Sequence, residues 1–137
     1  MSIRELDSCT MVADIVTWMN KVGHYPSPET AALYRGFITD ELRELVQAEV
    51  DGEGEAAEFK ELMDVLWVLI GYARARGWPI SKGFNEVSYS NYSKFTVVDG
   101  ELKVVRRDDG KILKPETYVE ADMQSVLNNK QEEMIYE

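Results

Sequence analysis

Two pairs of acidic residues are the groups in this chain best suited to chemistry. Glu41 and Glu44 form one acid-x-x-acid pair, and Glu61 and Asp64 form a second. Side chains three residues apart in a helix lie on the same face, about one turn apart. Each pair shares its helical arc with apolar residues, and carboxylates on a core-facing arc repel one another and lose hydration. A divalent cation takes carboxylate oxygens as ligands, so the pattern favours a metal site.

The same pairs also allow a simpler interpretation. Acid-x-x-acid pairs are common on solvated helix faces, where basic neighbours balance them. Arg43 and Lys60 are the basic residues placed to do so. Two pairs on consecutive helices are rarer than one, and from the residues alone both interpretations stay open.

Asn91 and Lys94 form a second group of interest. Asn91 follows Phe84 and Val87 at helical steps, which places it on the apolar face of its segment. A buried amide needs hydrogen-bond partners, because an unpaired one is destabilising. Together, Asn91 and Lys94 could meet a sugar hydroxyl and a phosphate. Alternatively, neighbouring backbone satisfies Asn91, and Lys94 extends to water.

Further downstream the chain gathers basic residues. Four of its 15 basic side chains fall within nine positions, at Arg106, Arg107, Lys111 and Lys114. Such a cluster could bind a polyphosphate, or it could be a solvated hairpin of alternating charges.

Three single residues complete the candidates. Trp18 lies near Asn20 and could stack on a base, although core packing is its expected role. His24 is the only histidine and lies in a proline-rich loop with no evident partner. A nucleophilic pair of Cys9 with His24 has no supporting signature.

The hydrophobic spacing predicts the elements that position these residues. Helices are expected at 9–22, 29–51, 55–76 and 81–95, and Ser27 followed by Pro28 is typical of a helix start. Asp99-Gly100 between β-branched runs predicts a hairpin with strands at 96–98 and 102–105. A further turn is expected at Asp109-Gly110, and a short helix at 119–127.

Three of the helices are expected to bury a defined apolar face. The expected faces are Leu33, Phe37, Ile38, Leu42, Leu45 and Val46 in the second helix, Leu62, Val65, Leu66, Leu69, Ile70 and Ala73 in the third, and Phe84, Val87, Ser88, Asn91 and Phe95 in the fourth. Because the loops are short, these helices should form an antiparallel, four-helix bundle-like core. The predicted class is all-α, a single domain over 1–137 with its core at about 9–95, and with the hairpin and a short final helix in 96–137.

Composition excludes several classes of protein. The 137 residues carry a net charge of −10, which disfavours binding to nucleic acid polymers. One cysteine cannot form an internal disulfide or a cysteine-based zinc site. No apolar run is long enough for a membrane span, and the N-terminal residues lack the layout of a secretion signal. We therefore expect a soluble cytoplasmic protein.

The order and spacing of these motifs resemble one family. Glu41-x-x-Glu44, sixteen residues and then Glu61-x-x-Asp64 resembles the ExxE…ExxD signature of the MazG-like all-α nucleoside triphosphate pyrophosphohydrolases. The segment 84–94 is similar to the family's fourth-helix motif, in which an Asn and a Lys contact the nucleotide. The segment 109–115 is similar to the basic segment of the branch related to phosphoribosyl-ATP pyrophosphohydrolase. The segment 14–19, followed by Pro26 and Pro28, fits the first helix and loop.

The resemblance implies a MazG-type fold and hydrolysis of a (d)NTP between its α- and β-phosphates, which gives a nucleoside monophosphate and pyrophosphate. It implies Mg²⁺ or Mn²⁺ as cofactor and a homodimer or homotetramer. The metal ligands would be Glu41, Glu44, Glu61 and Asp64, with Glu41 or Glu44 as the catalytic base. Asn91 and Lys94 would hold the sugar and phosphate. The further substrate contacts expected from the residues themselves are Arg107, Lys111 and Lys114 for the phosphates, and Trp18 and Asn20 for the base.

The resemblance leaves several details open. Many relatives have two adjacent glutamates where this chain has Asp40 and Glu41, so a role for Asp40 is open. Glu58, one turn before Glu61, is another carboxylate that could act as base. The substrate could be dGTP or GTP in a phage-type enzyme, dUTP or dCTP, or phosphoribosyl-ATP. The chain could also be a non-catalytic acidic helical module that binds a partner.

Overall fold

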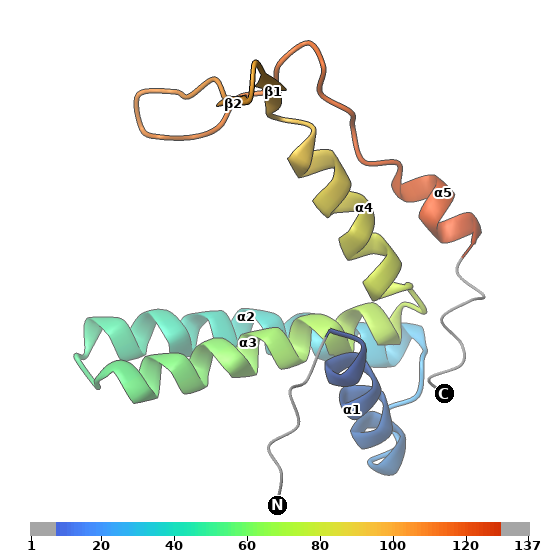
Figure 1. Cartoon of the computed structure of the whole chain (residues 1–137). Coiled ribbons are helices and arrows are strands. Elements are labelled where there is room, and N and C mark those ends of the chain that lie inside the picture. The colour runs from blue at the N-terminus through green and yellow to red at the C-terminus, as the bar shows by residue number, and fades with distance from the viewer. Residues whose placement is uncertain (1–7, 130–137) are drawn as a thin grey trace, which may run out of the picture. The chain divides into compact units, whose positions relative to one another are not determined.

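The computed structural model describes residues 8–129 and divides them into two compact units, one up to Ser81 and one from Lys82 onward. The elements in chain order are α1 (Ser8–Lys21), α2 (Pro28–Val50), α3 (Glu55–Ala75), α4 (Ile80–Tyr92), β1 (Thr96–Val98), β2 (Glu101–Lys103) and α5 (Met123–Asn128) (Figure 1). This confirms the predicted mostly helical class, with four main helices, a small hairpin and a short final helix. The first unit ends within α4, which continues into the second.

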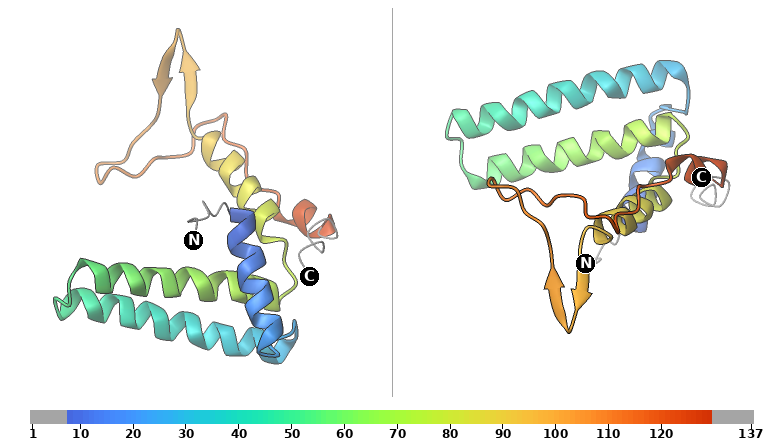
Figure 2. Two further views of the ribbon diagram at one scale, coloured as in Figure 1. Left: turned by 60° about the horizontal axis from the view of Figure 1, so that its bottom comes forward. Right: turned by 90° about the horizontal axis from the view of Figure 1, so that it is seen from above.

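The first unit is built on the antiparallel pair of α2 and α3, which lie side by side along their length (Figure 2). The α1 helix packs against α3. At the centre of the unit is a cluster of buried side chains: Ile15, Met19, Tyr34, Val68 and Ile70. Ile80, the first residue of α4, packs against this cluster. The core therefore lies where α1 meets the start of α2 and the end of α3.

The start of α2 is the one that the sequence predicts. Pro28 is its first residue, and the Ser27 hydroxyl accepts a hydrogen bond from the Thr30 backbone N–H at 3.0 Å. This bond satisfies one of the N–H groups that a helix start leaves without an intrahelical partner. The cap fixes where α2 begins.

The predicted apolar faces of α2 and α3 are only partly correct. The buried residues of α2 are Ala31, Tyr34 and Ala48, whereas Leu33, Leu42 and Val46 are exposed. In α3, Val65, Ile70 and Ala73 are buried as predicted, but Leu62 and Leu69 are exposed. Two of the three buried residues of α2 are alanines, whereas several of the larger apolar side chains of both helices are exposed. Within residues 8–129, no helix has both the length and the apolar character needed to cross a membrane.

In the second unit, the packed face of α4 differs from the predicted one. Ser90 is buried and donates a hydrogen bond from its hydroxyl to the Tyr118 hydroxyl at 3.1 Å. The Glu86 carboxylate accepts a hydrogen bond from the Asp122 backbone N–H at 2.9 Å. Phe84, Val87 and Asn91, which were expected to be buried, are exposed. Polar residues one turn apart therefore hold the C-terminal segment to α4.

Two helix ends in this unit also differ from the prediction. The α4 helix ends at Tyr92 instead of near Phe95, and the Ser93 hydroxyl donates to the Ser90 backbone carbonyl at 2.6 Å. Such a bond competes with helix continuation. The α5 helix begins at Met123 instead of Val119, because Asp122 is its N-cap and accepts from the Ser125 N–H.

The hairpin forms at the predicted Asp99-Gly100, but its turn has two residues, whereas the predicted strands left three, 99–101, between them. β1 and β2 are antiparallel, with Val98 paired to Glu101 across Asp99 and Gly100. Asp99 has φ 53° and Gly100 has φ 76°, as the favoured hairpin turn requires. β2 ends at Lys103, two residues earlier than predicted, and an isolated bridge joins Arg106 to Ile112 around the turn at 109–110.

Candidate metal centre

The four predicted carboxylates lie on the two paired helices. Glu41 and Glu44 are on α2, and Glu61 and Asp64 are on α3. Glu44 lies seven residues before Asp51 and Glu61 lies seven residues after Gly54, so the pairs are at equal distances from the turn. In an antiparallel helical hairpin, equal distance from the turn brings residues to the same level. The sequence spacing therefore explains why the two pairs meet.

Three of the carboxylates form a group that could hold a metal ion. Glu41, Glu61 and Asp64 each offer one oxygen, and these three atoms lie within 4.8 Å of one another. All three residues are half-buried. Glu44 is more exposed, and its carboxyl group contributes to the raised pKa of Glu41. The structure thus brings three of the predicted ligands together and leaves the fourth at the edge of the group.

The electrostatics of the group are concentrated on Glu41. Burial raises the pKa of Glu41 to about 7, and the hydrogen bond and charge of Glu44 and the charges of Asp64 and Glu61 act in the same direction. Each of these effects makes the charged carboxylate less favourable. A positive charge within the group would offset all of them.

Two oxygens of the group lack hydrogen-bond partners. Glu41 Oε2 and Glu61 Oε2 are both inaccessible to solvent, and neither forms a hydrogen bond. Buried polar atoms are normally satisfied, and an orphaned carboxylate oxygen is especially unfavourable. Mg²⁺ and Mn²⁺ are hard cations that prefer oxygen ligands. The donor set therefore fits a divalent cation of this type.

Lys60 supplies part of the positive charge. Its Nζ lies 2.6 Å from Asp64 Oδ2 and 4.0 Å from Glu61 Oε1, and the Asp64 hydrogen bond raises the pKa of Lys60. Its side chain is 69% exposed, so it can leave Asp64 at little cost. The ion pair predicted as the alternative to a metal site is thus present, but it does not reach the orphaned oxygens of Glu41 and Glu61.

The other acidic candidates lie outside the group. Asp40 forms an exposed ion pair with Arg43, with the two atoms 3.6 Å apart. Glu58 is half-buried on the first turn of α3 and is not part of the group of three. Asp40 is therefore balanced by arginine and does not join the carboxylates of the group.

The predicted base-stacking residues lie on α1. Trp18 is 43% exposed, so it is not the core residue that was expected. Its ring makes edge contacts with Trp67 and His24, with centroids 5.7 and 6.0 Å apart. Asn20 is half-buried near the end of the helix. An exposed indole held at its edge is able to stack on a planar ligand.

His24 has a partner that the sequence did not reveal. Its Nδ1 is hydrogen-bonded to the Tyr34 hydroxyl at 3.0 Å, and the two rings are in edge contact. Tyr34 is only 1% exposed, so this bond satisfies a buried hydroxyl. His24 therefore has a structural role, and the side chain of Cys9 is outside what the structure describes.

Asn91 and Lys94 lie in the second unit. Asn91 is exposed at the end of α4, not buried as expected, and Lys94 follows in the turn after it. The Lys94 backbone N–H donates to the Asn91 carbonyl at 3.1 Å. This turn keeps the two residues together, with the Asn91 amide open to solvent.

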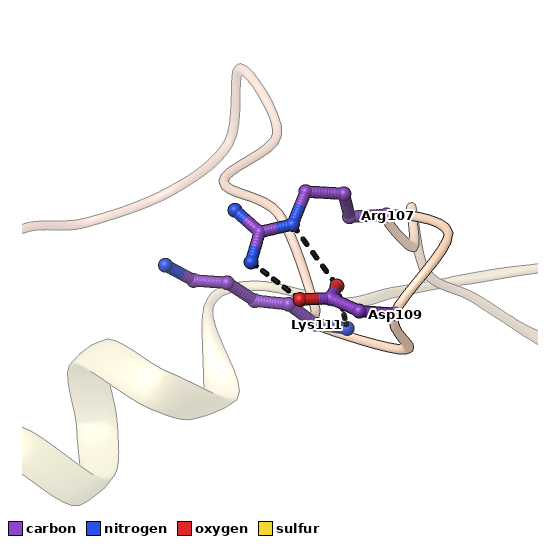
Figure 3. A network of polar contacts seen from close by, with 3 residues as sticks. All are labelled: Arg107, Asp109 and Lys111. Carbon is purple, nitrogen blue, oxygen red and sulfur yellow. Dashed lines mark hydrogen bonds and ion pairs between the residues drawn. The ribbon is translucent and has the colours of Figure 1, made fainter.

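The basic residues of the second unit are mostly engaged locally. Arg107 and Asp109 form a two-point ion pair through Nε and Nη2, at 2.9 and 2.5 Å (Figure 3). The Lys111 backbone N–H donates to the same carboxylate at 3.2 Å, and its side chain projects away (Figure 3). Lys114 Nζ lies 4.8 Å from the centre of the Tyr118 ring. The Arg107–Asp109 ion pair is what a solvated loop of alternating charges would show. The Lys111 side chain, in contrast, projects away and is available to a phosphate.

Sequence reasoning missed a second basic group, in the first unit. Arg35 on α2 and Arg76 after α3 both approach the ring of Tyr72, at 5.8 and 5.9 Å from its centroid. The signal present in the sequence was the four-residue step from Tyr72 to Arg76. Nothing in the sequence indicated that Arg35, from another helix, joins them.

Comparison with protein-family models gives no match to this chain, and comparison with curated proteins gives none either. The fold and the site define the class of protein. It is a mostly helical protein in which a cluster of three carboxylates could hold a metal ion. Its function must be argued from that group.

Proposed function

We propose that this protein is a divalent-metal-dependent pyrophosphohydrolase of nucleoside triphosphates. It would cut between the α- and β-phosphates and release a (d)NMP and pyrophosphate. One observation carries the proposal: Glu41, Glu61 and Asp64 offer oxygens within 4.8 Å of one another, and two oxygens of the group have no hydrogen-bond partner. The resemblance of the two acidic motifs and their spacing to MazG-like enzymes supports the choice of reaction.

Each carboxylate has a distinct task in this proposal. Glu41, Glu61 and Asp64 would hold Mg²⁺ or Mn²⁺, with Glu44 as a fourth, more exposed ligand. The cation neutralises phosphate charge and acidifies a bound water when present. Glu44 or Glu41 would accept the proton of the attacking water, and the pKa of Glu41, raised to about 7, suits that role. Phosphoryl transfer needs little other covalent chemistry.

The remaining predicted residues are proposed substrate contacts. Trp18 offers an exposed ring to the base, and Asn20 a nearby amide. Asn91 and Lys94 suit a sugar hydroxyl and a phosphate, and the basic side chains of Arg107, Lys111 and Lys114 suit the phosphate chain. The net charge of −10 works against binding of a triphosphate, and a cation at the acidic group would offset that repulsion.

A panel of the eight common NTPs and dNTPs tests the proposal. Each is incubated with Mg²⁺, and pyrophosphate is measured separately from orthophosphate. We expect pyrophosphate release from at least one substrate, with dGTP and GTP as first candidates and dUTP and dCTP included. Phosphoribosyl-ATP is assayed in parallel. Release of orthophosphate alone would contradict the proposed bond cleavage.

Two variants connect the activity to the metal centre. Glu41→Gln and Asp64→Asn should each lower turnover at least about 100-fold, because each removes a charged ligand. Glu49→Gln is the matched control, since Glu49 is an exposed residue on the same helix and outside the group. Helical content by circular dichroism should be equal in all three. Full activity in both ligand variants would show that the metal assignment is wrong.

A non-catalytic acidic module is the second candidate function. The 2.6 Å ion pair between Lys60 and Asp64 favours it, because it shows that part of the acidic charge is already balanced. This alternative predicts no turnover with Mg²⁺ or Mn²⁺ on any substrate of the panel, together with a stable complex with a partner protein. Turnover that depends on Glu41 would exclude it.

A further inference from the structure

A pocket of about 510 Å³ lies where the start of α2 meets the end of α3. It does not include the metal centre, because none of the four carboxylates lines it. Arg35 lies six residues before Glu41, which is about 9 Å along the helix at 1.5 Å per residue. The side chains that shape the pocket include Pro26, Pro28, Ala31, Arg35, Ala75 and Arg76.

Two guanidinium groups are held together at this pocket by one tyrosine. Arg76 Nη1 donates a hydrogen bond to the Tyr72 hydroxyl at 3.0 Å. Hydrogen bonding from Arg35, and then from Arg76, lowers the pKa of Tyr72. The Arg76 guanidinium also lies over the Trp78 ring, 4.4 Å from its centroid. Both arginines are therefore oriented by aromatic neighbours.

The positive charge of this pair is not balanced by the protein. Neither Arg35 nor Arg76 forms an ion pair with a carboxylate in the part of the chain that the structure describes. The helix dipoles do not provide the balance, because the start of α2 and the end of α3 have opposite signs. Two like charges at one place favour an anion between them.

We propose that this pocket binds the phosphate group of a small molecule, at a site separate from the metal centre. Two guanidinium forks match the several oxygens and the double charge of a phosphate better than the single charge of a carboxylate. The apolar wall of Pro26, Pro28 and Ala31 gives the rest of the molecule a surface to lie against. Inorganic phosphate and a phosphomonoester share this chemistry.

Calorimetric titration tests the proposal without involving the metal centre. Inorganic phosphate and AMP are titrated in EDTA into the full chain that carries Glu41→Gln. We expect saturable binding with one site per chain. Adding Arg35→Gln or Arg76→Gln should weaken it at least about tenfold, because each removes one guanidinium fork. Arg43→Gln is the matched control and should leave the affinity unchanged, since Arg43 pairs with Asp40.

Several outcomes would overturn the proposal. They are no saturable binding of either probe, equal affinity in both arginine variants, or tighter binding of malonate than of phosphate. Circular dichroism shows whether each variant folds, and if Arg76→Gln does not, Arg35→Gln decides. Tighter binding of AMP than of phosphate identifies a phosphomonoester as the ligand, and equal binding identifies free phosphate. The outcome is independent of NTP hydrolysis, which Glu41→Gln removes from the measurement.

Discussion

At the scale of single residues, burial and repulsion between the carboxylates act most clearly on Glu41. Its pKa is raised from 4.5 to about 7, first by burial and then by Glu44 and the other two carboxylates. Between these two pH values the folded protein binds more protons than the unfolded chain. Stability therefore falls as pH rises from about 4.5 to about 7 and stays reduced above that range.

This fall in stability with rising pH gives a prediction for the metal-free protein. In EDTA, the melting temperature should be higher at pH 5 than at pH 8, and Glu41→Gln should reduce that difference, because Gln does not ionise. Added Mg²⁺ should raise the melting temperature at pH 8 and have little effect at pH 5, where a proton occupies Glu41. Thermal melts by circular dichroism measure both effects. An unchanged pH slope in Glu41→Gln would contradict the assignment.

The same group shows what the sequence could and could not predict at this scale. The equal spacing of Glu44 and Glu61 from the turn made a meeting of the two pairs predictable. Lys60 forms its ion pair with Asp64 in one particular side-chain rotamer, and the spacing of residues in the sequence does not determine that rotamer. The meeting of Arg35 with Arg76 depends on how the two helices are rotated, and periodicity does not supply that rotation.

At the scale of elements, the close approach of α2 and α3 depends on Gly71. A Cβ at this position would collide with the ring of Tyr34, which is 1% exposed and bonded to His24. We predict that Gly71→Ala lowers the free energy of unfolding by about 1–3 kcal/mol through overpacking. Gly36→Ala is the matched control, since its added Cβ meets open space in α2. It should be neutral or stabilise by up to about 1 kcal/mol.

Urea unfolding followed by circular dichroism measures both variants. The informative quantity is the difference between them, because both replace a helical glycine by alanine. Equal stability of Gly71→Ala and Gly36→Ala would show that Tyr34 moves aside freely. That result would remove the basis for treating α2 and α3 as a rigid support for the carboxylates.

The helices themselves were largely predictable, and their ends were less so. α2 begins at Pro28 because Ser27 and Pro28 are local signals that act within one turn. The end of α4 was missed because it involves the Ser93 hydroxyl, which also accepts a hydrogen bond from the distant Val119 N–H at 2.7 Å. The exposed Leu42 was also missed, since periodicity identifies an apolar face without saying what covers it.

At the scale of the whole molecule, the first unit leaves a large amount of apolar side chain uncovered on α2 and α3. Leu42 and Val46 are one turn apart on α2, and Phe59 and Leu62 are one turn apart on α3, and all four are exposed. Large apolar side chains exposed together on two paired helices favour an interaction site. The resemblance to MazG-like enzymes implies a homodimer or homotetramer, and we predict that a second copy of the chain covers these four side chains.

We therefore predict that the protein in solution has at least twice the mass of one 15.7 kDa chain. Val46 and Phe59 are 58% and 62% exposed, so aspartate at either position should not disturb the single chain. Combining Val46→Asp with Phe59→Asp should produce a folded monomer, because an interface that buries these side chains would then bury unpaired charge. Light scattering after size exclusion measures the mass, and Val97→Asp on the hairpin, equally exposed, is the control. A monomeric wild-type protein would exclude self-association. An unchanged oligomer in the double variant would show that the chains associate through another surface.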